Sequence, residues 1–304
     1  MTTRKFQAIA SVLRSEIPQS DIQKSSHWQH YTNERTLNRD GTVSGISGFG
    51  GRARRTWLHQ KVHDHLQRRV LGKNHPVFEG PAYREASNYT KTQGRALDMD
   101  CLRHACTLDL LRAHHQKMSS PRNVTVIGDG QTNFVAAALA SGLYQKIVSI
   151  NLADVLLSDL ELLEALPGLD KNSVQISNSA ENLRSALKQP DTKVVLVPAQ
   201  HAIELGACDI DLVVNIASFQ EMNHDIVQSY FRFIRANFAW HYNCNRLRKV
   251  LPAGEVLDFM TWDWQGAEFL LDEICQWHQL WYTYRPPFLR PYDGPVQHRL
   301  AKFG

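Results

Sequence analysis

Beyond Pro121 the sequence alternates between short apolar runs and amphipathic segments, and this alternation restricts the fold more than any other feature. The apolar runs are typical of buried strands, and the segments between them have the apolar spacing of helices. Strands that alternate with helices predict an α/β fold with an open, mostly parallel sheet, helices on both faces and right-handed crossovers. The predicted strands are Val124–Gly128, Lys146–Ile150, Val174–Ile176, Lys193–Val197 (as an added strand) and Asp211–Ile216.

The C-terminal part is expected to complete this sheet. Leu247–Val250 and Val256–Phe259 could supply late antiparallel strands. An aromatic-rich helix is predicted over Ala267–Tyr284, where Trp277 and Trp281 have helical spacing.

The first 120 residues have a different pattern, with helical periodicity over Thr56–Val70 and Leu97–Met118. Glycine and proline interrupt the rest, so irregular loops are expected around Gly45–Gly51 and Tyr83–Gly94. We therefore predict a mainly helical region over 1–120, with loops placed to act as substrate lids, and an α/β domain over 121–304.

Composition sets the class of protein. The 304 residues are 43% hydrophobic, which is enough for a substantial core. No apolar run is long enough to span a bilayer and the N-terminus lacks the pattern of a secretory signal, so a cytoplasmic protein is expected. The five cysteines are widely spaced and form no C-x-x-C pair, so neither a disulfide framework nor a metal site is expected.

The net charge of +4 is unevenly spread, because basic residues are in excess over 1–120 and acidic residues over 121–304. A basic half can attract an anionic substrate, or it can be a solvated surface that faces the acidic half. Since no nucleic-acid motif is visible, a small molecule is the expected partner, not nucleic acid or a membrane.

A glycine turn follows the first predicted strand, with Gly128 and Gly130 directly after Val124–Ile127. Glycines at this point let backbone N–H groups approach a ligand, and the next helix N-terminus favours negative charge. The second strand ends at Asn151, where a polar side chain can hold ribose hydroxyls. These features indicate a nucleoside-type cofactor, although a βα turn without a ligand has the same pattern.

Polar residues also follow the strand Asp211–Ile216, beginning at Ser218 and ending at His224. In an open α/β sheet, ligands bind beyond the carboxyl ends of the strands, so this loop is a candidate active-site edge. The alternative is an ordinary strand-to-helix turn in which Ser218 or Asn223 caps the helix.

Together these segments resemble a class I S-adenosylmethionine-dependent methyltransferase, and more narrowly a bacterial family of sugar O-methyltransferases. The resemblance covers about residues 85–285. The segments that carry it are Ile127-Gly128-Asp129-Gly130, Ile150-Asn151-Leu152-Ala153-Asp154-Val155-Leu156, Asn215-Ile216-Ala217-Ser218-Phe219-Gln220-Glu221-Met222 and Asn245-Arg246-Leu247-Arg248-Lys249.

The resemblance implies a Rossmann-like sheet, S-adenosylmethionine as the cofactor, and the following roles. Gly128 and Gly130 would back the methionine end of the cofactor and Asn151 would face the ribose. The other implied cofactor-binding residues are Asp129, then Asn178, Ser179 and Ala180 around the adenine, and Ser218 and Phe219 next to the methyl group.

The chain departs from that family's pattern at three places. The family usually has an acid where Val126 and Asn151 stand, and often a glycine near Thr132 or Asn133. Two missing carboxylates would weaken hydrogen bonds to the cofactor by about 1–3 kcal/mol each. Asp129 or Asp154 could compensate.

Methyl transfer to a hydroxyl requires an aligned acceptor and removal of its proton. Glu221 and His224 are the candidate acid/base pair because they follow the strand ending at Ile216. His224 could instead be a surface residue in the first turn of a helix, and Glu221 could cap that helix or orient a substrate hydroxyl.

The acceptor is expected to be a sugar or a glycosylated small molecule. Arg246 and Lys249 could grip a phosphate or carboxylate, so an anionic acceptor would suit them, or they could form a salt-bridged helix end. The candidate substrate-binding residues are Gln220, Asn245, Arg246 and Lys249. A homodimer is compatible with these features. Two other functions stay open: a degenerate methyltransferase fold that only binds a partner, and a different reaction on the same fold.

Overall fold

The computed structural model describes residues 4–22, 24–32, 35–38, 43–44, 56–202, 204–282 and 286–303. Its main feature is an eight-stranded sheet with the order β11-β14-β8-β7-β3-β4-β6-β5. The strands are β3 (Asn123–Ile127), β4 (Lys146–Asn151), β5 (Val174–Ile176), β6 (Val194–Pro198), β7 (Leu212–Ile216), β8 (Trp240–Arg246), β11 (Ala267–Ile274) and β14 (Val296–Phe303).

The neighbouring strands β5, β6, β4, β3, β7 and β8 run parallel. Strand β14 pairs antiparallel with β8, and β11 pairs antiparallel with β14. The predicted fold class is therefore confirmed as a Rossmann-like, mostly parallel α/β sheet with late antiparallel strands.

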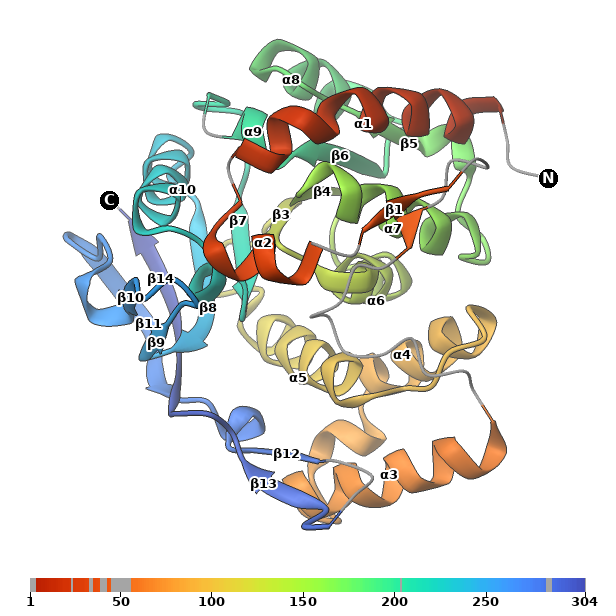
Figure 1. Cartoon of the computed structure of the whole chain (residues 1–304), viewed down its shortest axis with the longest axis vertical. Helices are drawn as coiled ribbons and strands as arrows, with labels where there is room; N and C mark the ends of the chain where they lie inside the picture. The colour runs from red at the N-terminus through yellow and green to blue at the C-terminus, as the bar shows by residue number, and fades with distance from the viewer. Residues whose placement is uncertain are drawn as a thin grey trace.

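Helices cover both faces of this sheet (Figure 1). Alternate residues of a strand point to opposite faces, so each strand supplies two hydrophobic cores. In β6, Val194 and Leu196 enter one core, whereas Val195 and Val197 enter the other. The first core holds α6 (Asn133–Ser141) and α7 (Ala153–Glu164). The second core holds α8 (Ala180–Lys188) and α10 (His224–Ala236).

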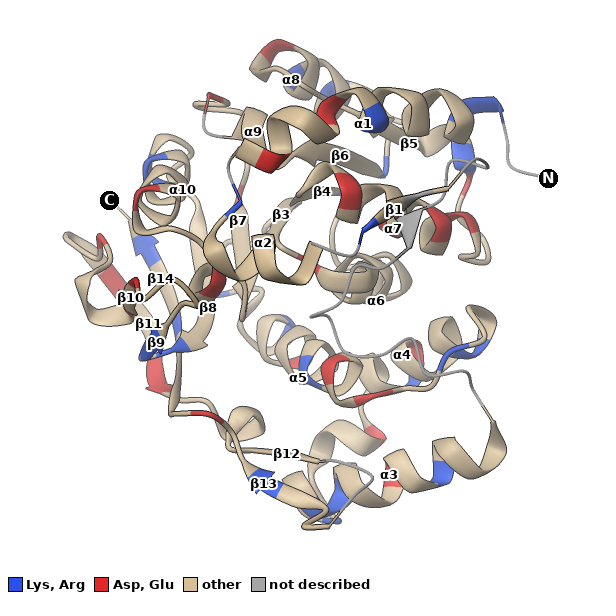
Figure 2. Ribbon diagram, viewed as in Figure 1, with Lys and Arg blue, Asp and Glu red and all other residues tan. Residues whose placement is uncertain are grey.

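The N-terminal region is mainly helical, as predicted. It comprises α1 (Arg4–Ile22), α2 (Ser26–Thr32), α3 (Trp57–Leu71), α4 (Pro81–Thr92) and α5 (Met99–His114). It also contains the short strands β1 (Thr36–Leu37) and β2 (Val43–Ser44). Helix α1 packs on α7, and α4 and α5 pack on α6, so these helices share the first core with the sheet (Figure 1). Figure 2 shows both signs of charge along α1, α3 and α5, so the basic excess is not gathered on one of them.

The predicted helix over Ala267–Tyr284 is wrong. This stretch contains β11, a short 3-10 turn at Gln276–His278 and β12 (Leu280–Tyr282), which pairs with β13 (Leu289–Pro291). Most of β11 is exposed at the sheet edge, so it lacks the alternating burial by which a strand can be recognised.

Several other segments also differ from expectation. The predicted late strands form a separate two-stranded sheet, β9 (Arg248–Val250) with β10 (Val256–Asp258). Most of the expected loop Tyr83–Gly94 is α4. The other expected lid, Gly45–Gly51, lies outside the described residues. Among the described residues, no helix has the length and apolarity that a bilayer crossing needs.

Candidate active site

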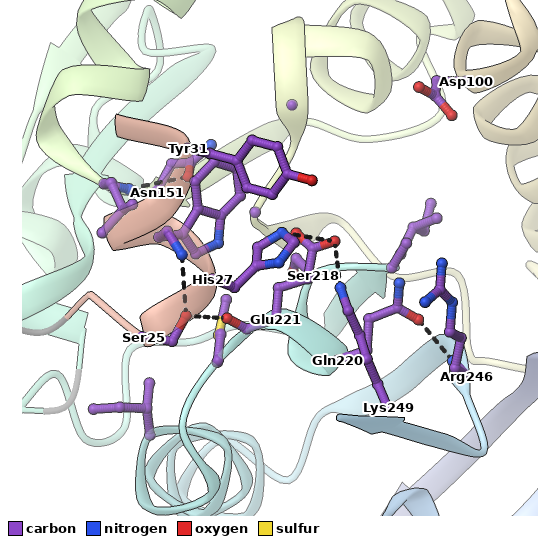
Figure 3. Close-up of a pocket in the computed structure, with 18 of the residues that line it drawn as sticks. Ser25, His27, Tyr31, Asp100, Asn151, Ser218, Gln220, Glu221, Arg246 and Lys249 are labelled. Carbon is purple, nitrogen blue, oxygen red and sulfur yellow. Dashed lines mark hydrogen bonds and ion pairs between the residues drawn. The ribbon is translucent and has the colours of Figure 1, made fainter. Parts of the chain in front are cut away.

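A cavity of about 680 Å³ lies at the carboxyl ends of the central strands (Figure 3). The sheet contributes Gly128 and Gly130 after β3, Asn151 at the end of β4, Ala199 after β6 and Ser218 after β7. The site is therefore at the edge where an open α/β sheet binds its ligands.

The glycine turn is fixed by its contact with Ser218. Gly128 has a φ of +72°, and a Cβ atom built on it would lie 2.3 Å from Ser218 Oγ. The backbone N–H of Gly128 donates to Ile150 O at 2.8 Å. Glycine is thus needed here for both backbone conformation and space.

Asp129 does not line the cavity, contrary to its predicted role. Its carboxylate accepts hydrogen bonds from the backbone N–H groups of Phe134 and Val135, at 2.9 and 2.8 Å. The residue is 1% exposed, and burial raises the pKa of its carboxyl group. Asp129 therefore caps α6 and occupies the helix N-terminus that a ligand would otherwise use.

Two consecutive residues without glycine's freedom adopt left-handed backbone after this turn: Gln131 with φ 61° and Thr132 with φ 53°. Such a conformation costs about 1–2 kcal/mol per residue. Arg95 holds the segment by donating to Gln131 Oε1 at 2.9 Å and to Asn133 Oδ1 at 2.6 Å. The chain thus keeps a glycine-like turn where the expected glycine is missing.

The residues expected around an adenine are not in the cavity. Asn178, Ser179 and Ala180 follow β5, which is the edge strand, and Ser179 caps α8 by accepting from the N–H of Asn182. The strand next to β4 is β6, so Ala199 takes the position at the cavity wall.

The loop after β7 is held by buried amides. Asn215 Nδ2 donates to Ile127 O at 3.0 Å and to Ser218 Oγ, while its Oδ1 accepts from Phe219 N at 3.1 Å. Asn245 Nδ2 donates to Asn215 Oδ1 at 2.8 Å, and Asn245 Oδ1 accepts from Gln220 N at 3.1 Å. This network fixes Ser218 and Gln220 at the cavity wall.

Two residues of the predicted site lie in the core instead. Asn245 is fully buried and belongs to the amide network, and it does not line the cavity. Phe219 is also fully buried, stacked on Tyr230 at 5.5 Å between ring centroids. Polar and aromatic residues at a strand end can thus support a site without touching its ligand.

Glu221 lies in the cavity between Lys249 and His27 (Figure 3). Its Oε1 is 3.1 Å from Lys249 Nζ and 3.4 Å from His27 Nε2. Burial acts to raise the pKa of Glu221, but His27 and Lys249 outweigh it, and the net shift is downward. Burial lowers the pKa of Lys249, while Glu221 opposes this shift. Glu221 is therefore an ionised carboxylate with partners on both sides.

His224 does not join this group. It is exposed at the start of α10, where its ring lies 3.3 Å from Gln228 Nε2, and it does not line the cavity. The structure therefore does not bring the predicted pair of Glu221 and His224 together, and the histidine beside Glu221 is His27.

The wall opposite the sheet is formed by residues 24–32, which we term the N-terminal strap. It contributes His27, Trp28 and Tyr31 from α2, and Ser25 Oγ donates to Glu221 O (Figure 3). Sequence reasoning missed these residues because they lie far along the chain from the glycine turn and β7. The aromatic spacing of the segment Ser26-His27-Trp28-Gln29-His30-Tyr31 was the available signal.

Buried charges anchor the strap to α7. The Asp154 carboxylate, which is fully buried, lies 2.6 Å from Lys24 Nζ and 2.7 Å from Arg35 Nη1. Asp21 completes the network at 2.7 Å from Lys24 and 2.8 Å from Arg35. Its hydrogen bond to Arg35 outweighs burial and lowers the pKa of Asp21 to about 2. Asp154, which lies on α7, thus helps to hold the strap in place as a wall of the cavity.

The fold by itself defines a Rossmann-like α/β protein with a cavity at the ligand-binding edge of its sheet. No protein-family model matches the chain, and no curated protein matches it. Some solved structures are similar at low identity. One from Thermoplasma acidophilum is 12% identical over 74% of this chain and 98% of that chain, with a TM-score of 0.43.

Two further similar structures are methyltransferases. The methyltransferase domain of bacterial CtHen1 is 11% identical over 68% of this chain and 100% of that chain, with a TM-score of 0.43. The plantazolicin methyltransferase BpumL in complex with SAH is 13% identical over 81% and 100%, with a TM-score of 0.36.

Proposed function

We propose that the protein is an S-adenosylmethionine-dependent O-methyltransferase that acts on a hydroxyl group of a sugar or sugar-containing small molecule. The observation that carries this proposal is the convergence of Gly128, Asn151, Ser218 and Glu221 on one cavity. The resemblance assigns the first three residues to cofactor binding, and Glu221 is the residue expected beside the acceptor. A single cavity can therefore hold both reactants.

The residues present fit a nucleoside cofactor. Gly128 and Gly130 leave backbone exposed at the cavity wall, and the side-chain amide of Asn151 can donate to and accept from ribose hydroxyls. Trp28 and Tyr31 offer aromatic faces across the cavity. Bound S-adenosylmethionine would supply an electrophilic methyl group. The chain must then position the acceptor and take up its proton.

His27 and Glu221 suit that proton transfer. Histidine commonly serves as a general base near neutral pH. The ionised Glu221 carboxylate lies 3.4 Å from His27 Nε2, so it would stabilise the imidazolium that forms when His27 accepts a proton. Lys249 keeps that carboxylate ionised. His27 is thus the proposed base and Glu221 the group that holds it.

The first experiment measures cofactor binding. Asn151→Ala is expected to weaken the affinity for S-adenosylmethionine about 5- to 150-fold, because one hydrogen-bonding group in a buried site contributes about 1–3 kcal/mol. Asn178→Ala is the matched control, since Asn178 lies outside the cavity, and it should leave the affinity unchanged. Isothermal titration calorimetry gives both dissociation constants.

The same titration tests the rival function. A wild-type protein that fails to bind S-adenosylmethionine at millimolar concentration would favour a degenerate fold that binds another partner. The observation behind this rival is Val126, which stands in the buried core in place of the expected acid. Equal weakening by Asn151→Ala and Asn178→Ala would count against the assigned cavity.

A second experiment measures turnover. His27→Gln is expected to reduce methyl transfer about 100-fold, the lower range of what a general base contributes, with little change in cofactor affinity. His224→Ala should keep wild-type turnover because His224 is exposed and outside the cavity. Transfer of radiolabelled methyl groups to a panel of sugars provides the rate. Full turnover in His27→Gln would rule out this base.

A further inference from the structure

Arg103, Arg246 and His278 meet around the ring of Tyr292, and we term these four residues the Tyr292 cluster. The guanidinium carbons of Arg103 and Arg246 lie 4.9 and 4.8 Å from the ring centroid, and the His278 ring packs edge-on at 5.7 Å. All four residues line the cavity that holds Glu221. They come from segments far apart in the sequence, so only the fold assembles the cluster.

The two arginines are more buried than the carboxylates that accompany them. The Arg103 and Arg246 side chains are 9% and 14% exposed, whereas those of Asp100 and Asp293 are 38% and 89% exposed. Exposed carboxylates stabilise an ion pair only weakly. The buried Nε atom of each arginine has no hydrogen-bond partner among the described residues. The arginines therefore retain capacity to bind an anion from the cavity.

His278 adds a neutral hydrogen-bond donor. Its Nδ1 lies 3.2 Å from Cys275 Sγ and 3.5 Å from Cys244 Sγ. Burial raises the pKa of the Cys275 thiol, so a protonated thiol can donate to Nδ1. When this thiol donates to Nδ1, the ring proton is on Nε2.

The Nε2 atom of His278 is available for a ligand. The residue is 1% exposed, and this atom has no hydrogen-bond partner within the part of the chain that the structure describes. The two thiols and Nδ1 lie within 4.8 Å of one another, close enough to share a metal ion.

Lys249 is less suited than Arg103 to the role that the sequence suggested for it beside Arg246. Its ammonium group is bound to Glu221 at 3.1 Å, whereas Arg103 shares the Tyr292 ring with Arg246. Two guanidinium groups offer planar, paired donors that match a carboxylate or phosphate better than an ammonium group does.

We propose that the Tyr292 cluster binds an anionic group, a carboxylate or a phosphate, on the acceptor sugar. That this sugar is the methyl acceptor rests on the proposed methyl transfer, whereas anion binding itself does not depend on that reaction. The test therefore measures binding in the absence of cofactor. Full-length protein is titrated in a calorimeter with D-glucuronate, D-glucose 6-phosphate and uncharged D-glucose.

At least one anionic sugar is expected to bind ten times more tightly than glucose, and the tighter of the two identifies carboxylate or phosphate. Arg103→Gln and Arg246→Gln should each reduce that affinity at least tenfold. Arg235→Gln is the matched control, because Arg235 also has a carboxylate partner and an aromatic neighbour but lies outside the cavity. Rising salt concentration should weaken anion binding by the wild-type protein. This measurement does not depend on whether the arginine variants fold.

The results separate the two proposals. Equal binding of glucose and both anionic sugars, or unchanged affinity in both arginine variants, would overturn the anion site. Methylation of uncharged sugars as fast as anionic ones would support the methyltransferase proposal and contradict the anion site. Anion binding through both arginines without methyl transfer would support the anion site and contradict the methyltransferase proposal.

Discussion

Gly128→Ala is expected to destabilise the protein by about 2–5 kcal/mol, the sum of a left-handed backbone and a steric overlap. Gly128 has a φ of +72°, and an added Cβ would lie 2.4 Å from Ser218 Cβ. Ser218 is held in place because its Oγ donates to Ile127 O at 2.9 Å and accepts from Asn215. Urea unfolding followed by circular dichroism gives the change in the free energy of unfolding.

Gly142→Ala separates the two causes. Gly142 also has positive φ, at +60°, but nothing lies within 4 Å of its added Cβ. Its cost should be the backbone contribution alone, about 1–2 kcal/mol. The double variant Gly128→Ala with Ser218→Gly removes the overlap and should recover part of the loss. Equal costs for the Gly128 and Gly142 variants would mean that Ser218 moves away freely, contrary to this account.

The strand–helix alternation was sufficient to predict the parallel sheet, because buried strands such as β6 and β7 are continuous apolar runs. The order of strands was harder to predict. The run Lys193–Val197, expected as an added strand, covers most of β6, the inner strand next to β4, whereas Val174–Ile176 is at the edge. Complete burial of β6 and partial burial of β5 reflect these positions.

Site residues could be predicted from the sequence where they directly follow the end of a predicted strand. The predicted residues that do line the cavity are Gly128, Gly130, Asn151, Ser218, Gln220, Glu221, Arg246 and Lys249. The strap residue His27 was missed, as were Arg103, His278 and Tyr292 of the Tyr292 cluster, because they reach the cavity from segments far away in sequence. Asp129 and Asn245 were assigned to ligands because capping and buried amide networks use the same side chains as ligand binding does.

Asp154→Ala is expected to cost about 3 kcal/mol, because it removes the buried carboxylate that pairs with Lys24 and Arg35. Among the described residues, the only carboxylate that the network keeps for them is Asp21, whose side chain is 39% exposed. The Asp154 side chain is fully buried and the Lys24 side chain is 2% exposed, at a separation of 2.6 Å. Asp154 also accepts from Arg35 at 2.7 Å. Urea unfolding should show the loss. Trypsin should cleave after Lys24 faster than in the wild type, because the strap is less firmly held.

The control for Asp154 is Asp263→Asn, which breaks the exposed pair with Arg235, where the side chains are 36% and 30% exposed. An exposed pair contributes about 0–1 kcal/mol, so this variant should unfold almost like the wild type. Because the strap also carries His27 to Glu221, Asp154→Ala should lower methyl transfer even under conditions where the sheet remains folded. Wild-type stability and unchanged cleavage after Lys24 would show that the buried charges do not hold the strap, and packing of Trp28 and Tyr31 would then have to close the cavity.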